Sequence, residues 1–174
     1  MPVKALDTLV IGTGPAGEGA AMKLAKAGQR VAVVEAYTQV GGGCTHWGTI
    51  PSKALRHNIQ MLADYRRNPL FQHTLDQVEI EFPDLLRAAD AVITEQVRTR
   101  YRYYQRNRVE VLFGQARLVD PNHVEVLRPD GVADLFQARH IGIAPGSRPR
   151  PDRYLLGRAK SWGPGVGSFG PQTA

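Results

Sequence analysis

The fold is decided by residues 6–35, which read LDTLVIGTGPAGEGAAMKLAKAGQRVAVVE. A short apolar run at 6–11 ends at a glycine, and residues 20–27 are rich in helix formers and are followed by Gly28, where a helix commonly ends. The valine-rich run at 31–34 is typical of a strand that is covered on both faces. This order of strand, helix and strand predicts an α/β domain with a parallel sheet and a right-handed crossover.

The glycines between the first strand and the helix, in Gly12-Thr-Gly14-Pro-Ala-Gly17, follow a spacing that suits phosphate binding. Gly12 permits a tight turn, Gly14 lets the backbone approach a pyrophosphate, and Gly17 allows close helix–strand packing. Glu35 ends the second strand 18 residues after Gly17, where a carboxylate can accept hydrogen bonds from a ribose. We therefore predict dinucleotide binding, and the alternative is that the glycines serve only turns and packing.

The rest of the chain predicts two helices and a set of short strands. The helices are expected at 51–67 and 83–106, the second with an apolar stripe that faces a core. From 109 to 137, turns with the sequences Asp-Pro-Asn and Pro-Asp-Gly separate short strands, which indicates a β-meander. A separate apolar strand at 140–144 is expected to return to the sheet.

The positive charge of the chain is concentrated near its end. The 174 residues include 22 basic and 16 acidic side chains, a formal charge of +6, and residues 145–174 contain five basic side chains against one acidic. Arg98, Arg102 and Arg106 alternate with tyrosines, but their spacing puts them on one solvated helix face. We therefore expect no nucleic-acid binding.

Composition also excludes other classes of protein. The chain contains no apolar run of about 18 residues, so no membrane span is expected. The single cysteine, Cys44, excludes an internal disulfide and favours a reducing, cytoplasmic location. Cys44 and His46 have no second ligand pair at a familiar spacing, so no metal site is expected.

A second glycine-rich segment, residues 41–53, reads GGGCTHWGTIPSK. Three consecutive glycines suggest a backbone that lies against a ligand. The segment resembles the flavin-side segment of the pyridine nucleotide–disulfide oxidoreductases, which typically carry two cysteines separated by four residues. Cys44 matches the first cysteine, whereas Thr49 stands at the second position, so a dithiol relay within this chain is impossible.

That substitution narrows the resemblance to the soluble, FAD-dependent pyridine nucleotide transhydrogenases. Residues 17–21, 41–57, 104–110, 113–117 and 146–149 carry the similarity. It implies a Rossmann-like FAD-binding domain and an enzyme that passes a hydride from NADPH to flavin and then to NAD⁺, which needs no thiol pair. It also implies pyridine nucleotides as partners. Members of the family form homo-oligomers, but the dimerisation domain is expected to be absent here.

The resemblance also implies roles for particular residues. Glu35 would bind the adenosine ribose, Cys44 and Thr49 would lie beside the isoalloxazine, and Lys53 would place a cation near the reactive flavin nitrogen. The alternative for Lys53 is an exposed helix lysine. The implied catalytic residues are Lys53, Cys44 and Thr49; the implied cofactor-binding residues are Gly12, Gly14, Pro15, Ala16, Gly17, Glu35, Ala36, Tyr37, Thr38, Gln39, Val40, Gly41, Gly42, Gly43, Cys44, Thr49, Lys53, Gly114, Ala116, Ala144 and Gly146. Pro145 replaces the threonine of an Ala-Thr-Gly motif and removes a backbone donor there.

The expected domain organisation is an incomplete FAD-binding domain at 1–148 and a disordered tail at 149–174, rich in glycine, proline and arginine. The family's nicotinamide-binding and dimerisation domains do not fit after residue 149. The chain is therefore expected to be truncated relative to the family and to lack transhydrogenase activity on its own. An interrupted reading frame is our hypothesis for the tail. The alternative function is an inactive fragment that binds FAD or its adenylate half.

Overall fold

The computed structural model describes residues 3–71 and 79–147, which fall into two compact units. The first unit comprises the described residues up to Cys44 and from Val97 onward, and the second comprises those between Thr45 and Gln96. The predicted tail at 149–174 lies outside the described residues, so the predicted domain boundary stays a prediction.

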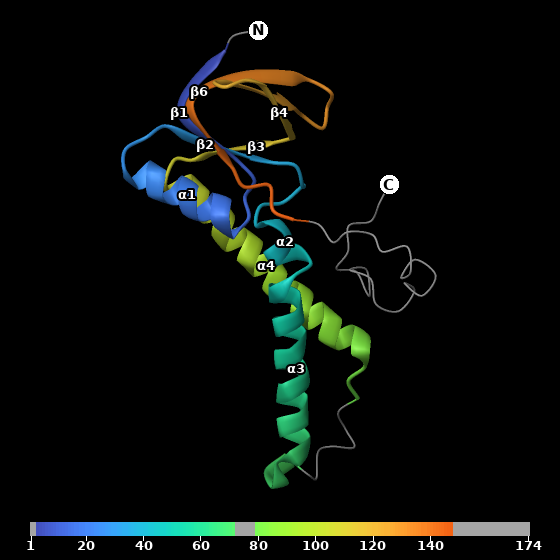
Figure 1. The fold of residues 1–174 in the computed structure, drawn as a ribbon. Helices are drawn as coiled ribbons and strands as arrows, with labels where there is room; N and C mark the ends of the chain where they lie inside the picture. Colours follow the sequence, from blue (N-terminus) through green and yellow to red (C-terminus); the bar gives the residue numbers. More distant parts are fainter. Residues whose placement is uncertain (1–2, 72–78, 148–174) are drawn as a thin grey trace. The chain divides into compact units, whose positions relative to one another are not determined.

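The first unit is built on a six-stranded mixed sheet with the order β3-β2-β1-β6-β5-β4 (Figure 1). Its strands are β1 (Lys4–Ile11), β2 (Val31–Glu35), β3 (Glu110–Phe113), β4 (Gln115–Asp120), β5 (His123–Leu127) and β6 (Ala133–Ile143). Strands β3, β2, β1 and β6 are parallel neighbours, and β6, β5 and β4 pair antiparallel. Both the parallel sheet and the meander predicted from the sequence are therefore confirmed.

Apolar side chains cover the parallel strands on both faces. Successive side chains of a strand point to opposite faces of the sheet. On β1, Leu9 therefore packs with the meander and Val10 packs with the helices. On β2, Val34 lies on the meander side and Val33 on the helix side. Every residue of β2 is buried. Burial of each such valine or leucine contributes about 1.5–3 kcal/mol, so this two-sided core stabilises the carboxyl ends of the strands.

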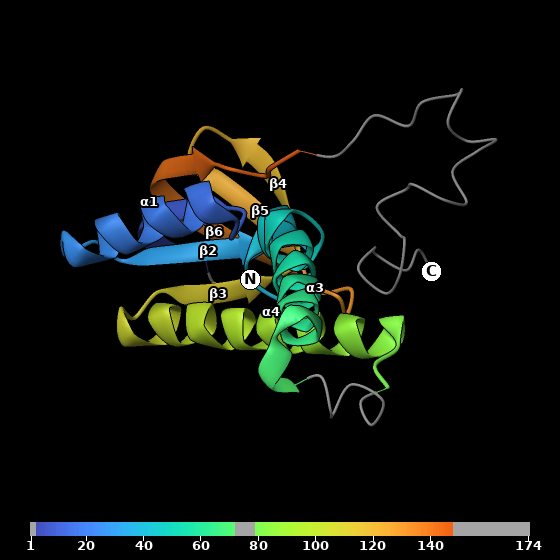
Figure 2. The same cartoon turned by 90° about the horizontal axis from the view of Figure 1, so that it is seen from below.

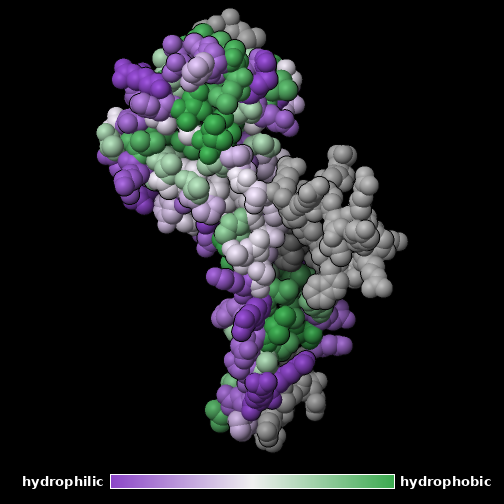
Figure 3. All heavy atoms as spheres, in the orientation of Figure 1, coloured by the Kyte–Doolittle hydropathy of each residue, from purple (hydrophilic) through white to green (hydrophobic). Residues whose placement is uncertain are grey.

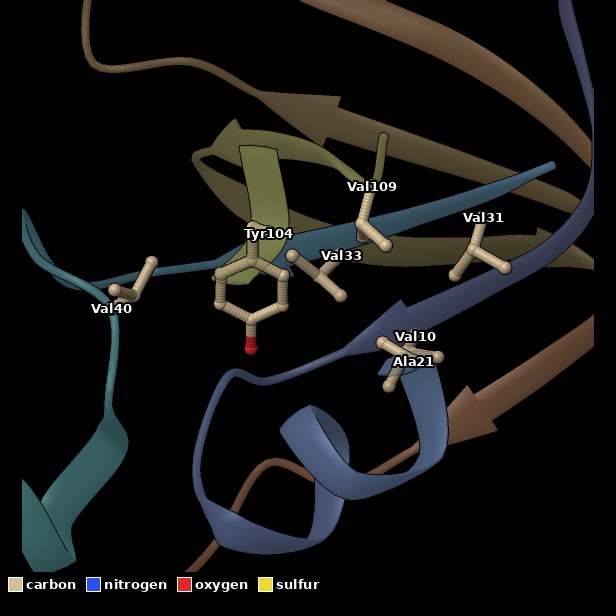
Figure 4. Close-up of a cluster of buried hydrophobic side chains, with 7 residues drawn as sticks. All are labelled: Val10, Ala21, Val31, Val33, Val40, Tyr104 and Val109. Atoms are coloured by element: carbon tan, nitrogen blue, oxygen red, sulfur yellow. The ribbon is translucent and has the colours of Figure 1, made fainter. Parts of the chain in front are cut away.

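Two helices cover the helix-side face. α1 (Pro15–Lys26) contributes Ala21, and the C-terminal part of α4 (Phe82–Arg106) contributes Tyr104. Figure 4 shows these side chains with the valines of β1 and β2. In the view from below, β2 and β3 appear between α1 and this part of α4 (Figure 2), and the Arg100–Glu18 ion pair connects the two helices. Gly28, with φ of +82°, follows the end of α1 as predicted.

The pairing of the later strands differs from the prediction in two respects. β3 belongs to the parallel part of the sheet, and Gly114 alone separates it from β4 at the opposite end of the strand order. The strand expected at 140–144 is not separate, because β6 runs unbroken from Ala133 to Ile143. Its first residues pair with β5 and its later ones with β1, so one long strand joins the meander to the parallel sheet.

The described part of the second unit is helical and includes α3 (Thr49–Arg67) and the first part of α4, up to Gln96, whereas the rest of α4 belongs to the first unit. α3 and α4 confirm the helices predicted at 51–67 and 83–106. A short helix that the sequence did not predict, α2 (Gly42–His46), forms within the second glycine-rich segment. Arg98, Arg102 and Arg106 are exposed, as the solvated-face interpretation predicted. None of the described helices is long and apolar enough to cross a membrane.

Candidate dinucleotide-binding site

The turn after β1 is formed by backbone atoms that leave no room for a side chain. Gly12 has φ of +104°, and a Cβ built on it would lie 2.1 Å from the Ala144 carbonyl oxygen. The Gly12 N–H donates to the Val34 carbonyl oxygen over 2.7 Å, and the Ala144 N–H donates to the Ile11 carbonyl oxygen over 2.8 Å. The carboxyl ends of β1, β2 and β6 are therefore tied together at this glycine.

The other glycines of the pattern fix α1 and the second glycine-rich segment against this turn. A Cβ on Gly17 would lie 2.0 Å from the Gly12 carbonyl oxygen, so only glycine lets α1 approach the turn this closely. Gly42 has φ of +62°, and its Cβ would lie 2.7 Å from the Gly14 Cα. The structure thus brings together the glycines of both motifs, which the sequence placed 28 residues apart at Gly14 and Gly42.

The N-terminus of α1 is open to an anion. Gly14 is its N-cap residue, Pro15 occupies its first position, and no side chain caps it. The first N–H groups of a helix have no partner within the helix, and the helix dipole favours a negative group at this end. A phosphate is therefore a chemically suitable ligand here.

A buried polar network at the end of β2 connects the two glycine-rich segments. Glu35 is 8% exposed; its Oε2 accepts a hydrogen bond from the Thr13 N–H over 3.2 Å and another from the Thr13 hydroxyl. Its Oε1 accepts from the Tyr37 N–H over 2.9 Å, and the Thr13 Oγ1 accepts from the Gly41 N–H over 3.0 Å. This network holds the Glu35 carboxylate at the carboxyl end of β2, beside the glycine turn.

Thr13 is the site residue that sequence reasoning missed. Its side chain is fully buried and connects Glu35 to Gly41. It stands between two glycines, at a position that the glycine pattern leaves free. The hydroxyl of Thr13 could have indicated its role, because a threonine hydroxyl next to a tight turn commonly forms hydrogen bonds with nearby backbone groups.

The remaining predicted residues occupy several places in the fold. Gly43 and Cys44 lie on α2, and Cys44 is partly buried. Thr49 and Lys53 lie exposed on α3 in the second unit. In the loop at 36–40, Ala36, Thr38 and Gln39 are exposed, Tyr37 is half-buried and Val40 is buried. On α1, Pro15 and Ala16 are exposed in the first turn.

Of the predicted residues Gly114 and Ala116, the first lies at the glycine-turn site and the second does not. The Gly114 N–H donates to the Glu35 carbonyl oxygen over 2.9 Å, so Gly114 borders the site. Ala116 instead packs among the side chains of the meander-side cluster. Ala144 borders Gly12, whereas Gly146 is exposed with φ of +76° and open space around it.

Two other features of the described residues lie outside this site. A shallow cleft between β3 and the meander is lined by the whole of β3 and by charged side chains that include Lys4, Glu110 and Arg128. Hydrophobic side chains also gather on the first unit in the view of Figure 3. Among the described residues no group of three or more His, Cys, Asp and Glu side chains is arranged to hold a metal ion.

The parallel strands, the glycine turn at their carboxyl ends and the buried acid define a dinucleotide-binding α/β domain. Sequence comparison gives the family. The profile of the family described as "Pyridine nucleotide-disulphide oxidoreductase" matches residues 6–159, and the chain belongs to this family.

Comparison with individual proteins shows which members of the family this chain resembles. The chain is 55% identical over 143 residues to the soluble pyridine nucleotide transhydrogenase of Hamiltonella defensa subsp. Acyrthosiphon pisum, and 52% identical over 147 residues to that of Colwellia psychrerythraea. These alignments cover 82% and 84% of the chain but 31% and 32% of the relatives, so the chain spans about a third of their length. The solved Cu(II) complex of the HOCl-induced flavoprotein disulfide reductase RclA from Escherichia coli is similar in fold, with a TM-score of 0.70 and 26% identity over 88% of this chain and 31% of that one.

Proposed function

We propose that this chain forms the adenosine- and pyrophosphate-binding part of an FAD site in a pyridine nucleotide transhydrogenase. The observation that carries the proposal is the network from Glu35 through Thr13 to Gly41, next to the packed glycines. In this network the Glu35 carboxylate, which can accept hydrogen bonds from ribose hydroxyls, lies next to the glycine backbone, which suits phosphate. An adenosine diphosphate group requires these two features side by side.

The residues at this site fit such a group chemically. Glu35 would hold the ribose, because a carboxylate has about four lone-pair sites and its known partners leave acceptor capacity. The open first turn of α1 and the backbone at Gly14 and Gly42 would hold the pyrophosphate. The loop at 36–40 and Gly114 border the same edge and would lie along the nucleotide.

The proposed chemistry rests on the relatives and on the residues after Gly42. FAD, when bound, would supply a carrier that accepts and releases two electrons between NADPH and NAD⁺. With Cys44 as the single cysteine, the chain itself holds no thiol pair for electron storage. Cys44 and Thr49 would line the flavin, and the Lys53 ammonium would favour negative charge on the reduced ring.

The names of the relatives support pyridine nucleotides as the substrates. A cytoplasmic location is part of the same proposal. A second candidate function is FAD binding without hydride transfer. It is favoured by the observation that residues 3–71 and 79–147 contain one glycine turn of the dinucleotide type, whereas transhydrogenation also requires a place for a nicotinamide.

The first experiment is a visible absorption spectrum of the purified 174-residue chain after incubation with FAD and desalting, with heat-denatured chain as the control. Near-stoichiometric flavin bands in the folded sample alone would support FAD binding. Flavin-loaded chain would then be mixed with NADPH and an NAD⁺ analogue whose reduced form absorbs at a separate wavelength. Reduction of the analogue would support transhydrogenation, and flavin retention without it would support the second candidate. Loss of all flavin from a folded sample would contradict both.

A further inference from the structure

The first turn of α1 carries a negative charge close to the proposed phosphate site. Glu18 lies in that turn, and its backbone N–H donates to the Gly14 carbonyl oxygen over 2.9 Å. An uncompensated carboxylate at this place would repel the phosphates that the helix N-terminus otherwise attracts. The site therefore needs a group that offsets the charge of Glu18.

Arg100 on α4 is that group. Its Nε lies 3.0 Å from the Glu18 Oε2, with the two side chains 17% and 22% exposed. Both residues belong to the first unit. Low exposure weakens screening by water, so this pair interacts more strongly than the exposed pairs on the surface.

Tyr104, one turn further along α4, completes the cluster. Its side chain is fully buried, and its hydroxyl points toward the turn between β1 and α1 (Figure 4). Within the described residues this hydroxyl is buried without a hydrogen-bond partner. Burial raises the pKa of Tyr104, and the charges of Glu18 and Glu35 raise it further, so the hydroxyl stays protonated and available as a donor.

We propose that Arg100 is a positioning residue for the nucleotide site, which neutralises Glu18 and keeps the N-terminus of α1 attractive to phosphate. The Tyr104 hydroxyl acts with it from the same helix. This inference rests on the proposed function, because the phosphate is that of the dinucleotide. It assigns α4, which carries no part of the glycine motifs, a role in binding affinity.

The test is FAD affinity, measured by flavin fluorescence, in the wild type, Arg100→Gln, Glu18→Gln and the double variant. We expect Arg100→Gln to weaken binding about tenfold, as one uncompensated charge near a helix N-terminus would. The double variant should return to within about twofold of the wild type, because no charge is left to neutralise. Arg102→Gln, an exposed arginine of the same helix, removes an equal charge and should bind like the wild type.

The rescue separates electrostatic support from simple packing. If Arg100 served only the packing of α4, the double variant would bind as weakly as Arg100→Gln, and this result would overturn the inference. Equal binding by Arg100→Gln and Arg102→Gln would also overturn it. Tyr104→Phe tests the role of the hydroxyl. If the Tyr104 hydroxyl acts with Arg100, its removal should lower the affinity for FAD. Unchanged FAD affinity would show that the hydroxyl has no part in binding.

Inorganic pyrophosphate is the second probe, read out by amide chemical shifts at Ala16 and Gly17. If the wild type binds pyrophosphate with the expected order of variants but retains no FAD, the proposed function fails and the role of Arg100 stands. If the wild type retains FAD and Arg100→Gln does too with equal affinity, the role of Arg100 fails and the proposed function stands. A wild-type chain that binds neither probe contradicts both.

Discussion

The two parts of the chain that we assign to the cofactor differ in how they are built. Around Gly12, Gly17 and Gly42, backbone packs on backbone and a polar network is buried beside it. On α3, Thr49 and Lys53 are exposed on a helix of the other unit. The binding part is therefore inseparable from the folded core of the first unit, whereas the residues proposed for chemistry can change without disturbing a core.

The largest expected effect follows from replacing Gly17 with alanine. The new Cβ would lie 2.0 Å from the Gly12 carbonyl oxygen, and neither backbone segment can move without breaking the strand ends. We expect a loss of more than about 3 kcal/mol in the free energy of unfolding and no retained FAD. Chemical denaturation followed by circular dichroism measures the first, and desalting measures the second.

Gly19→Ala is the matched control for this substitution. Gly19 lies on the same helix, two residues further on, and a Cβ there meets nothing within 4 Å. Alanine should stabilise the helix by about 0.5–1 kcal/mol, because glycine is a poor helix former. If both variants retained FAD equally, the close packing at Gly17 would be irrelevant to the site.

Thr13→Val should have the next largest effect. Valine keeps the shape of the buried side chain but removes the hydroxyl that bonds to Glu35 and Gly41. A buried carboxylate that loses one of its donors destabilises the fold by about 1–3 kcal/mol. The Kd for FAD should rise about tenfold or more, because the Glu35 carboxylate and the backbone at Gly41 lose their shared support.

The control is Thr8→Val, at a buried threonine on β1 whose hydroxyl donates to the Gln29 Oε1 over 2.7 Å. It removes a comparable hydrogen bond away from the glycine turn. Stability should fall while the Kd for FAD stays within about twofold of the wild type. A similar loss of affinity in both threonine variants would show that the Thr13 effect is a general loss of stability.

The contrast between the two regions also explains what could be predicted from the sequence. Glycine spacing and the valine run fix local geometry, so the turn at Gly12, the helix α1 and the buried strand β2 were predictable. The role of Thr13 was not, because it depends on Glu35 and Gly41, which are distant in sequence and meet only in the folded sheet.

The later strands show the same limit. The turns after β4 and β5 are local signals and were predicted correctly. The parallel pairing of β3 with β2, and the continuous strand β6, depend on long-range register with β2 and β1. Hydrophobic periodicity places residues on faces but does not choose the neighbouring strand, so those pairings could not be predicted.

A smaller effect is expected at Asp7, in the amino-terminal half of β1. The Arg30 backbone N–H donates a hydrogen bond to the Asp7 Oδ2 over 2.8 Å. This hydrogen bond, together with the nearby guanidinium groups of Arg30 and Arg139, holds the pKa of Asp7 below its usual range. The lowered pKa gives the folded state stability above the unfolded value of about 3.9, and this is lost as pH falls through the folded pKa. Asp7→Asn should lower stability at pH 7 without changing FAD affinity.

Denaturation at several pH values checks the Asp7 prediction. The stability difference between the wild type and Asp7→Asn should shrink as the pH falls below about 4, because the unfolded wild type then takes up a proton that the folded state resists. The difference is lost once the pH is below both pKa values of Asp7, where the carboxyl group is neutral in both states. A difference that stayed constant down to pH 2 would mean that the carboxylate charge is unimportant. A change in FAD affinity would contradict the separation between Asp7 and the glycine turn after β1.

The smallest expected effect on the fold is that of Lys53→Met. The side chain is exposed on α3, so the free energy of unfolding should change by less than about 0.5 kcal/mol. If Lys53 acts as proposed, the effect appears instead in the reduction potential of bound FAD, which should fall because a cation that favours the reduced ring is gone. Lys26→Met, at an exposed lysine in the last turn of α1, should change neither quantity. An unchanged reduction potential in Lys53→Met would mean that Lys53 is an ordinary surface lysine. A large loss of stability would mean that Lys53 supports the fold, which would contradict the difference between the two regions described above.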